Sequence, residues 1–143
     1  MNHDRYETDY LAGILKDTRT IALLGASPNP ERPSNGVMRF LLSRGYEVFP
    51  VNPGQAGKEI AGRIVYATLA DVPQPVDMVE VFRASEYLDG VVNDALSLQP
   101  LPKVIWAQLG VRDDAAAARA EAAGIKVVMN RCPAIEIPRL LQA

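Results

Sequence analysis

The chain has 143 residues, 48% of them hydrophobic, and its 15 basic and 17 acidic side chains give a net charge of −2. That length allows one domain with a buried core, and no apolar stretch approaches the roughly 20 residues that span a bilayer. The mixed charge argues against nucleic acid as a partner, because nucleic-acid binding normally needs a concentrated basic face. With one cysteine and one histidine, the chain lacks the pair for an internal disulfide and the clustered ligands of a structural zinc site.

Residues 1–18 are predicted to form an N-terminal helix that packs on a core of residues 19–143. Apolar side chains recur at near-helical spacing from Tyr6 to Leu15. The first ten residues are polar and acidic, unlike a secretory signal peptide. The lone Cys132 suits a reducing compartment, so we expect a cytoplasmic protein.

From residue 20 onward, apolar runs alternate with amphipathic helical stretches. Continuous apolar runs are typical of strands that are buried on both faces. Strands are expected within residues 20–27, 46–54, 76–82, 103–110 and 125–130. Helices are expected within residues 34–45, 84–98 and 113–124, with Ser34 and Ser85 as N-caps, and a short, partly helical element within residues 133–143.

This alternation predicts an α/β fold, namely a single Rossmann-like, doubly wound domain. We expect a five-stranded parallel sheet in the order 3-2-1-4-5, with helices on both faces. In such sheets, ligands bind beyond the carboxyl ends of the strands. The segments that follow the five expected strands therefore carry the candidate site: residues 25–35, 52–58, 82–85, 107–111 and 130–133.

The loop after the first expected strand, "GASPNPERPSNG", has the chemistry of a phosphate cradle. Its glycines do not follow the G-x-G-x-x-G spacing of a dinucleotide site, and the sequence contains no Gly-Lys-Ser/Thr of a Walker loop. Ser27 and Ser34 nevertheless offer hydroxyls, Arg32 offers a guanidinium group, and the amides of Asn35 and Gly36 belong to a helix N-terminus. The alternative is an ordinary strand-to-helix loop followed by a capped helix.

The later strand ends add further polar groups. Asn52 stands where an NAD-binding domain usually places an acid, which favours a nucleotide whose ribose bears a phosphate. Lys58 or Arg63 would neutralise that phosphate, unless both are solvated surface charges. Arg83 suits a phosphate or an adenine ring, and Gln108 suits a base or an amide.

Six short motifs follow one another along the chain: "GAS…RPSN", "VxPVNP", "GKEIxG", "VFR", "WxQxG" and "NRC". In this order and spacing, from about Thr20 to Leu141, the chain resembles the small stand-alone CoA-binding proteins. Those proteins share their fold with the CoA-binding domains of the succinyl-CoA synthetase α subunit and of ADP-forming acyl-CoA synthetases. The resemblance implies that the ligand is coenzyme A or an acyl-CoA.

The resemblance also implies how the ligand is held: the loop after the first strand binds phosphates, the second strand end flanks the adenosine, and the third and fourth strand ends line the cleft. The candidate cofactor-binding residues are Gly25, Ala26, Ser27, Arg32, Pro33, Ser34, Asn35, Asn52, Pro53, Lys58, Phe82, Arg83, Gln108, Leu109 and Cys132. Larger relatives carry a basic residue shortly after the second-strand proline, where this chain has Gln55. Lys58 is the candidate replacement that would meet the 3′-phosphate of CoA.

We expect binding without catalysis. The only histidine, His3, lies in a tail that is expected to fray, so phosphohistidine chemistry and a Ser-His-Asp triad are excluded. Cys132 remains as a nucleophile without a histidine base, and a mixed disulfide between this thiol and CoA stays open.

Two alternative functions and the state of assembly also stay open. The first alternative is an NAD(P)-binding redox sensor or oxidoreductase subunit, which the missing glycine pattern weakens. The second is a structural subunit with a vestigial cleft, in which Arg32 and Arg83 would turn outward. A homodimer, or a complex with a separate acyl-transfer enzyme, is compatible with a domain of this kind.

Overall fold

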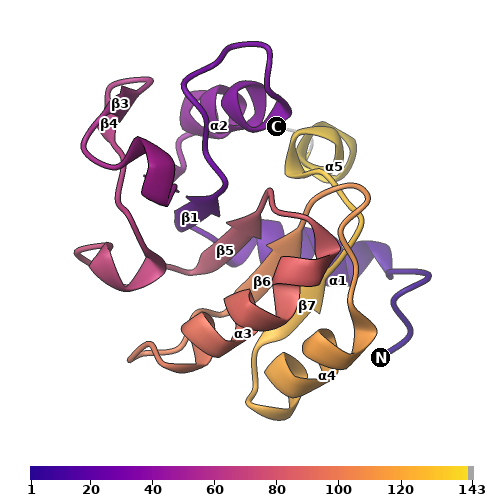
Figure 1. The fold of residues 1–143 in the computed structure, drawn as a ribbon. Coiled ribbons are helices and arrows are strands. Elements are labelled where there is room, and N and C mark those ends of the chain that lie inside the picture. The colour runs from indigo at the N-terminus through magenta and orange to yellow at the C-terminus, as the bar shows by residue number, and fades with distance from the viewer. Residues whose placement is uncertain (142–143) are drawn as a thin grey trace.

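The computed structural model describes residues 1–141, which form an open parallel sheet with helices on both faces (Figure 1). The strands of the five-stranded sheet are β1 (Thr20–Leu24), β2 (Glu47–Val51), β5 (Met78–Val81), β6 (Val104–Ala107) and β7 (Lys126–Val128). Every neighbouring pair is parallel. The predicted Rossmann-like α/β class, with one five-stranded parallel sheet, is confirmed.

The predicted strand order 3-2-1-4-5 is wrong, because β5 pairs with β1 and not with β2. Counted along the chain, the five strands lie in the order 2-1-3-4-5. Pro50 gives the physical reason: proline has no N–H to donate, so it is confined to the outer side of an edge strand. Glu47 N donates toward β1, to Arg19 O, whereas Pro50 O accepts on the outer side, from Tyr66 N. β2 is therefore an edge strand.

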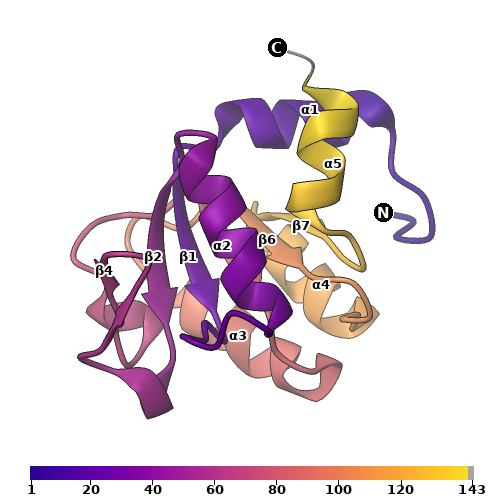
Figure 2. The same ribbon diagram turned by 90° about the horizontal axis from the view of Figure 1, so that it is seen from above.

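The segment between β2 and β5 forms short elements that the sequence patterns do not predict. A short hairpin pairs β3 (Glu59–Ile60) with β4 (Arg63–Ile64) through a turn in which Ala61 and Gly62 both have positive φ. Two 3₁₀ turns flank the hairpin, η1 (Pro53–Gln55) and η2 (Leu69–Asp71). The hairpin lies beside the β2 edge of the sheet (Figure 2) and away from α3 and α4 (Figure 1).

Helices cover the two faces of the sheet as predicted. One face carries α3 (Leu88–Leu96) and α4 (Asp114–Ala122), and the other carries α1 (Thr8–Asp17), α2 (Pro33–Ser43) and α5 (Pro133–Leu140). Alternate strand residues enter the two cores: Val79 and Ile105 pack under α3 and α4, whereas Leu23 and Trp106 pack under the other three helices. Figure 2 shows α2 and α5 side by side on their face.

Two helices, α2 and α3, begin at other residues than expected. Arg32, not Ser34, is the N-cap of α2, with Pro33 in the first helical position, where its missing N–H has no cost. Ser85 is not an α-helical cap but begins a 3₁₀ turn, η3 (Ser85–Tyr87), that leads into α3. The last expected element is one helix that contains Pro138, and its final residues, 142–143, lie outside the described part of the chain.

The N-terminal tail is not frayed, so that expectation about His3 is wrong. The His3 side chain is buried, with Nδ1 at 2.6 Å from Tyr6 Oη and Nε2 at 3.2 Å from Glu121 Oε1. Tyr6 Oη in turn accepts a hydrogen bond from Met129 N at 2.8 Å. These contacts tie the first residues to α4 and to the end of β7. Within residues 1–141, no helix is both long enough and apolar enough to cross a membrane.

Candidate functional site

Two adjoining hollows lie at the carboxyl edge of the sheet, and together they are called the cleft below. The first hollow has a volume of about 320 Å³ and is lined by Gly25, Ser27, Arg32, Pro33, Ser34, Asn52, Gln55 and Phe82. The second has a volume of about 350 Å³ and is lined by Pro33, Phe82, Arg83, Ala84, Gln108, Leu109 and Val111. Because Pro33 and Phe82 line both, the hollows form one continuous depression across the ends of β1, β5 and β6.

Gly25 allows three strand ends to meet under the first hollow. Its φ is +86°, and a Cβ atom at this position would lie 2.3 Å from the carbonyl oxygen of Phe82. Gly25 N also donates to Val51 O at 2.9 Å, which joins the ends of β1 and β2. Any side chain here would both strain the backbone and collide with the end of β5.

Two predicted binding residues, Asn35 and Asn52, use their side-chain amides to hold the loop after β1. Asn35 Nδ2 donates to Ser27 O at 2.9 Å, and its Oδ1 accepts from Arg39 Nε at 2.9 Å. Asn52 Nδ2 donates to Ala26 O at 2.8 Å, and its Oδ1 accepts from Gly54 N at 3.0 Å. Both side-chain amides are therefore engaged within the protein, where they fix the shape of the loop that borders the cleft.

The first hollow offers donors for an anion and no competing acid among its lining residues. Arg32 is exposed at the N-terminus of α2, and no side chain caps that terminus. Ser34, in the first turn, also lines the hollow. A guanidinium group beside the positive end of a helix dipole is a suitable partner for phosphate oxygens.

The second hollow is mainly apolar, with Pro33, Phe82, Leu109 and Val111 in its wall. Leu109 is one of the exposed large hydrophobic side chains. Arg83 lies over the Tyr87 ring, with its guanidinium carbon 4.5 Å from the ring centre. Both Arg32 and Arg83 thus line the cleft. In a structural subunit with a vestigial cleft, both side chains were expected to turn outward.

Several predicted residues do not line the cleft. Ala26 is buried behind the loop, Pro53 lines a small neighbouring hollow, and the exposed Lys58 lies at the start of the β3–β4 hairpin. Arg63, the other candidate for a ribose phosphate, lies over the Phe49 ring at 5.1 Å and 3.9 Å from Glu47. Gln55, which stands where larger relatives carry a basic residue, does line the first hollow.

Cys132 also lies outside the cleft. It is the N-cap of α5 and is 5% exposed, packed in the core beside Trp106. The indole Nε1 of Trp106 donates to the backbone oxygen of Arg131 at 3.0 Å, which fixes the backbone next to this thiol. Catalysis by Cys132 would therefore require the thiol to leave the core. Within residues 1–141, no group of three or more His, Cys, Asp and Glu residues is placed to hold a metal ion.

Sequence reasoning missed Glu80, a fully buried carboxyl group in the central strand β5. It is 0% exposed, and neither of its oxygens has a hydrogen-bond partner. Burial, together with the nearby Cys132, raises the pKa of Glu80 well above its usual range. The available signal was a lone glutamate inside the apolar run "VDMVEVF", because a strand buried on both faces has no solvent-facing position for it.

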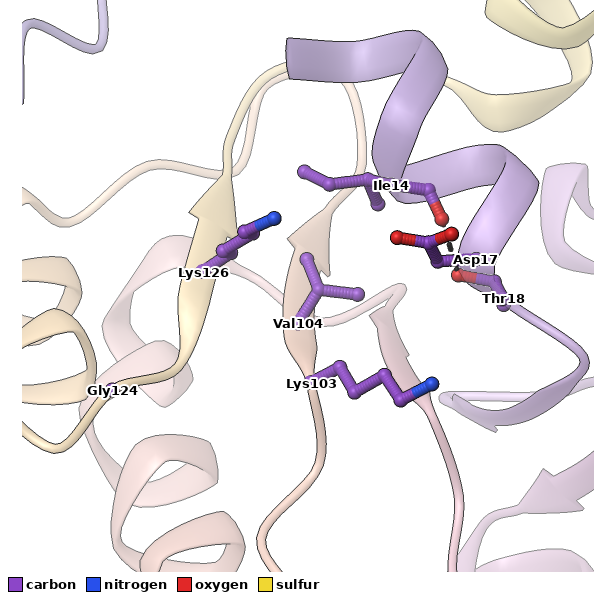
Figure 3. Close-up of a pocket in the computed structure, with 7 residues that line it drawn as sticks. All are labelled: Ile14, Asp17, Thr18, Lys103, Val104, Gly124 and Lys126. Atoms are coloured by element: carbon purple, nitrogen blue, oxygen red, sulfur yellow. Dashed lines mark hydrogen bonds between the residues drawn. The ribbon is translucent and has the colours of Figure 1, made fainter.

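A further hollow of about 250 Å³ lies at the opposite, amino edge of the sheet (Figure 3). Its wall comes from the end of α1 and from the starts of β6 and β7, where Lys103 and Lys126 stand. It contains none of the predicted binding residues. Because doubly wound sheets bind their ligands at the carboxyl edge, the cleft is the candidate site.

Comparisons with known proteins identify the family of this chain. A family model described as the CoA binding domain matches residues 19–138. The chain is 35% identical over 119 residues to the uncharacterised protein YneT of Bacillus subtilis (strain 168), covering 83% of this chain and 85% of YneT. The solved structure of a hypothetical protein from Pyrococcus horikoshii OT3 is similar with a TM-score of 0.89 and 36% identity, covering 99% of this chain and 96% of that one.

A larger protein also contains a related segment. The chain is 30% identical over 84 residues to the ADP-forming acetate–CoA ligase I α subunit of Pyrococcus furiosus, covering 56% of this chain and 18% of that subunit. The predicted relationship to small stand-alone CoA-binding proteins is confirmed by the matches that span most of the chain. The chain belongs to the CoA binding domain family.

Proposed function

We propose that this chain, with helix α1 included, is a single domain that binds coenzyme A in the cleft without catalysing a reaction. The observation that carries the proposal is the first hollow, which sets Arg32 beside the uncapped N-terminus of α2 and has no acid in its wall. This arrangement suits the diphosphate of CoA, because charge-assisted bonds from an arginine and a helix N-terminus both favour phosphate. Family membership supports CoA as the ligand.

The two hollows suit the two halves of the CoA molecule. The adenosine is proposed to lie toward Asn52 and Pro53, and the diphosphate beside Arg32 and Ser34. The pantetheine arm would then follow the second hollow along Phe82, whose neighbours in that wall are mainly apolar. An arm of methylene, methyl and amide groups fits an apolar wall that carries a few polar side chains.

Binding without turnover is proposed because the cleft lacks the usual catalytic groups. No histidine, cysteine, aspartate or glutamate is among the residues that line the two hollows. Ser27 and Ser34 do line the first hollow, but a serine nucleophile needs a neighbouring general base, and the lining residues offer no histidine or carboxylate for that role. The thioester or thiol at the end of the arm would therefore be held but not transformed.

Calorimetric titration tests the proposal, with CoA as the ligand and ADP and NAD as comparators. We expect CoA to bind more tightly than NAD, and Arg32→Ala to weaken CoA binding about tenfold or more, which corresponds to at least ~1.4 kcal/mol. Arg44→Ala is the matched control, because Arg44 follows the far end of α2 and lies over the Phe40 ring. Tighter binding of NAD than of CoA, or no binding of CoA, would overturn the proposal.

A further inference from the structure

Unpartnered oxygen atoms gather on two residues next to the cleft, Glu80 and Gln108. Among the described residues, four buried side-chain atoms lack a hydrogen-bond partner, and three of them are Glu80 Oε1, Glu80 Oε2 and Gln108 Oε1. Glu80 is 0% exposed and Gln108 is 9% exposed. A buried acceptor without a donor destabilises the folded protein by about 1–3 kcal/mol. Three such oxygens on two residues therefore need a physical explanation.

The strand register places these two side chains on the same face of the sheet. Glu80 in β5 stands opposite Trp106 in β6, and Gln108 follows two residues later. Gln108 N donates to Val81 O at 3.1 Å, so the parallel pairing continues past the end of β6. Residues two apart on a strand point to the same face, which makes Glu80 and Gln108 diagonal neighbours. With strands about 4.8 Å apart and a rise of about 3.3 Å per residue, diagonal neighbours lie about 8 Å apart, within reach of two long side chains.

An ionised Glu80 cannot satisfy Gln108 Oε1, because a carboxylate and an amide oxygen are both acceptors only. A neutral carboxyl group has an O–H that can donate, so a single proton would give both residues a partner. Burial away from charged partners favours this neutral form. Cys132 is the titratable group near Glu80, and it forms no hydrogen bond with either set of oxygens.

The outer end of the Gln108 amide is free. Gln108 lines the second hollow. Neither atom of its amide has a hydrogen-bond partner among the described residues, but Oε1 is buried whereas Nε2 is not. The orientation of the amide therefore decides whether the hollow receives a donor or an acceptor.

We propose that Glu80 is a positioning residue, whose neutral carboxyl group donates its O–H to Gln108 Oε1 and so holds Gln108 Nε2 toward the second hollow. The N–H group presented there recognises a carbonyl oxygen of the ligand. This inference rests on the proposed function, in which the second hollow holds the pantetheine arm. That arm contains amide carbonyls and ADP does not, so Gln108 distinguishes CoA from ADP.

The binding test compares the affinities for CoA and for ADP in three variants. Glu80→Leu and Gln108→Leu remove the donor and its acceptor, and each is expected to weaken CoA binding about tenfold while ADP binding stays within about twofold. Glu80→Gln is expected to retain the wild-type CoA-to-ADP ratio, because its amide N–H replaces the carboxyl O–H. Gln55→Met is the matched control in the first hollow and is expected to change both affinities equally. If Glu80→Leu leaves the ratio of the CoA affinity to the ADP affinity unchanged, whether or not both affinities fall, the inference is overturned.

An infrared measurement on the ligand-free protein tests the pairing without reference to CoA. A neutral Glu80 gives a carboxylic-acid C=O band at neutral pH, which is absent in Glu80→Gln and shifts in Gln108→Leu because the acceptor is lost. Absence of the band, or a band that Gln108→Leu leaves unshifted, would overturn the pairing. If the band behaves as expected but the wild-type protein binds no CoA, the proposed function fails and the Glu80–Gln108 pairing stands.

Discussion

The side-chain amide of Asn52 donates a hydrogen bond to the backbone oxygen of Ala26 at 2.8 Å. This bond joins the end of β2 to the loop that follows β1. The same side chain accepts from Gly54 N, so one residue holds two loops at the rim of the first hollow. The shape of the candidate site therefore depends on a residue whose polar atoms are already occupied.

Replacing Asn52 by alanine should destabilise the protein and weaken CoA binding together. Two hydrogen bonds are lost, so the free energy of unfolding is expected to fall by about 1–2 kcal/mol. Chemical denaturation and CoA titration measure the two effects. Gln74→Ala, at an exposed position away from the cleft, is the control and should change neither quantity. Full stability in the Asn52 variant would contradict the role assigned to this side chain.

Gly25→Ala is expected to lower the free energy of unfolding by about 3 kcal/mol or more. The new Cβ would meet the Phe82 oxygen at 2.3 Å, and the positive φ of the residue disfavours any side chain. Gly13→Ala, in the middle of α1 with no atom within 4 Å of its new Cβ, should instead stabilise the protein by up to about 1 kcal/mol. Similar effects of the two changes would argue against a close approach of β1 and β5.

The stability of the protein should depend on pH through Glu80. Its pKa is raised in the folded state, so the folded protein keeps a proton that the unfolded chain releases above the ordinary pKa of 4.5. The contribution of Glu80 is therefore fully present below pH 4.5 and is lost as the pH rises through the folded-state pKa, by up to ~1.4 kcal/mol per pH unit.

Urea denaturation of the wild-type and Glu80→Gln proteins across this pH range measures that contribution. The wild-type free energy of unfolding should decrease relative to that of the variant as the pH rises. Taking the difference cancels groups that both proteins share, such as Asp77, whose pKa is lowered by hydrogen bonds from Arg19 and Thr20. The exposed Glu86 provides a control substitution to glutamine. A difference that does not vary with pH would mean that Glu80 ionises normally in the folded protein.

Lys58 and Arg63 should contribute differently to recognition of the 3′-phosphate. Lys58 is exposed three residues after Gln55, which lines the first hollow, and the proposed binding mode sets the adenosine beside the nearby Asn52 and Pro53. Lys58→Ala is therefore expected to weaken CoA binding by up to about tenfold and to leave dephospho-CoA binding unchanged. Arg63→Ala should affect neither ligand, because Arg63 lies over Phe49. Calorimetric titration of each variant with CoA and with dephospho-CoA measures these effects. If Arg63→Ala weakened the binding of CoA but not of dephospho-CoA, the 3′-phosphate contact would belong to Arg63 and not to Lys58.

Local sequence patterns were sufficient for the five strands of the parallel sheet and for the helices that cover it, but not for the β3–β4 hairpin. Continuous apolar runs mark β1, β2, β5, β6 and β7 because each strand is buried on both faces. The close approach of Gly25 to the Phe82 carbonyl oxygen was not predicted and comes from the structure. Since every parallel strand ends at the same edge, the chain positions of Arg32, Arg83 and Gln108 also predicted that they would meet.

The tertiary structure decided which strands are neighbours and which polar groups remain free. The predicted order 3-2-1-4-5 made the second strand internal and so overlooked Pro50, which is compatible only with an edge strand. The partner strand β1 and the bridging Tyr66 come from other segments of the chain. The burial of His3 depends likewise on Glu121, and the occupied amide of Asn52 depends on Ala26. The spacing of apolar residues along the sequence indicates which face of a helix or strand is buried. Hydrogen bonds between segments far apart in the chain determine what it contacts, and only the folded structure brings those segments together.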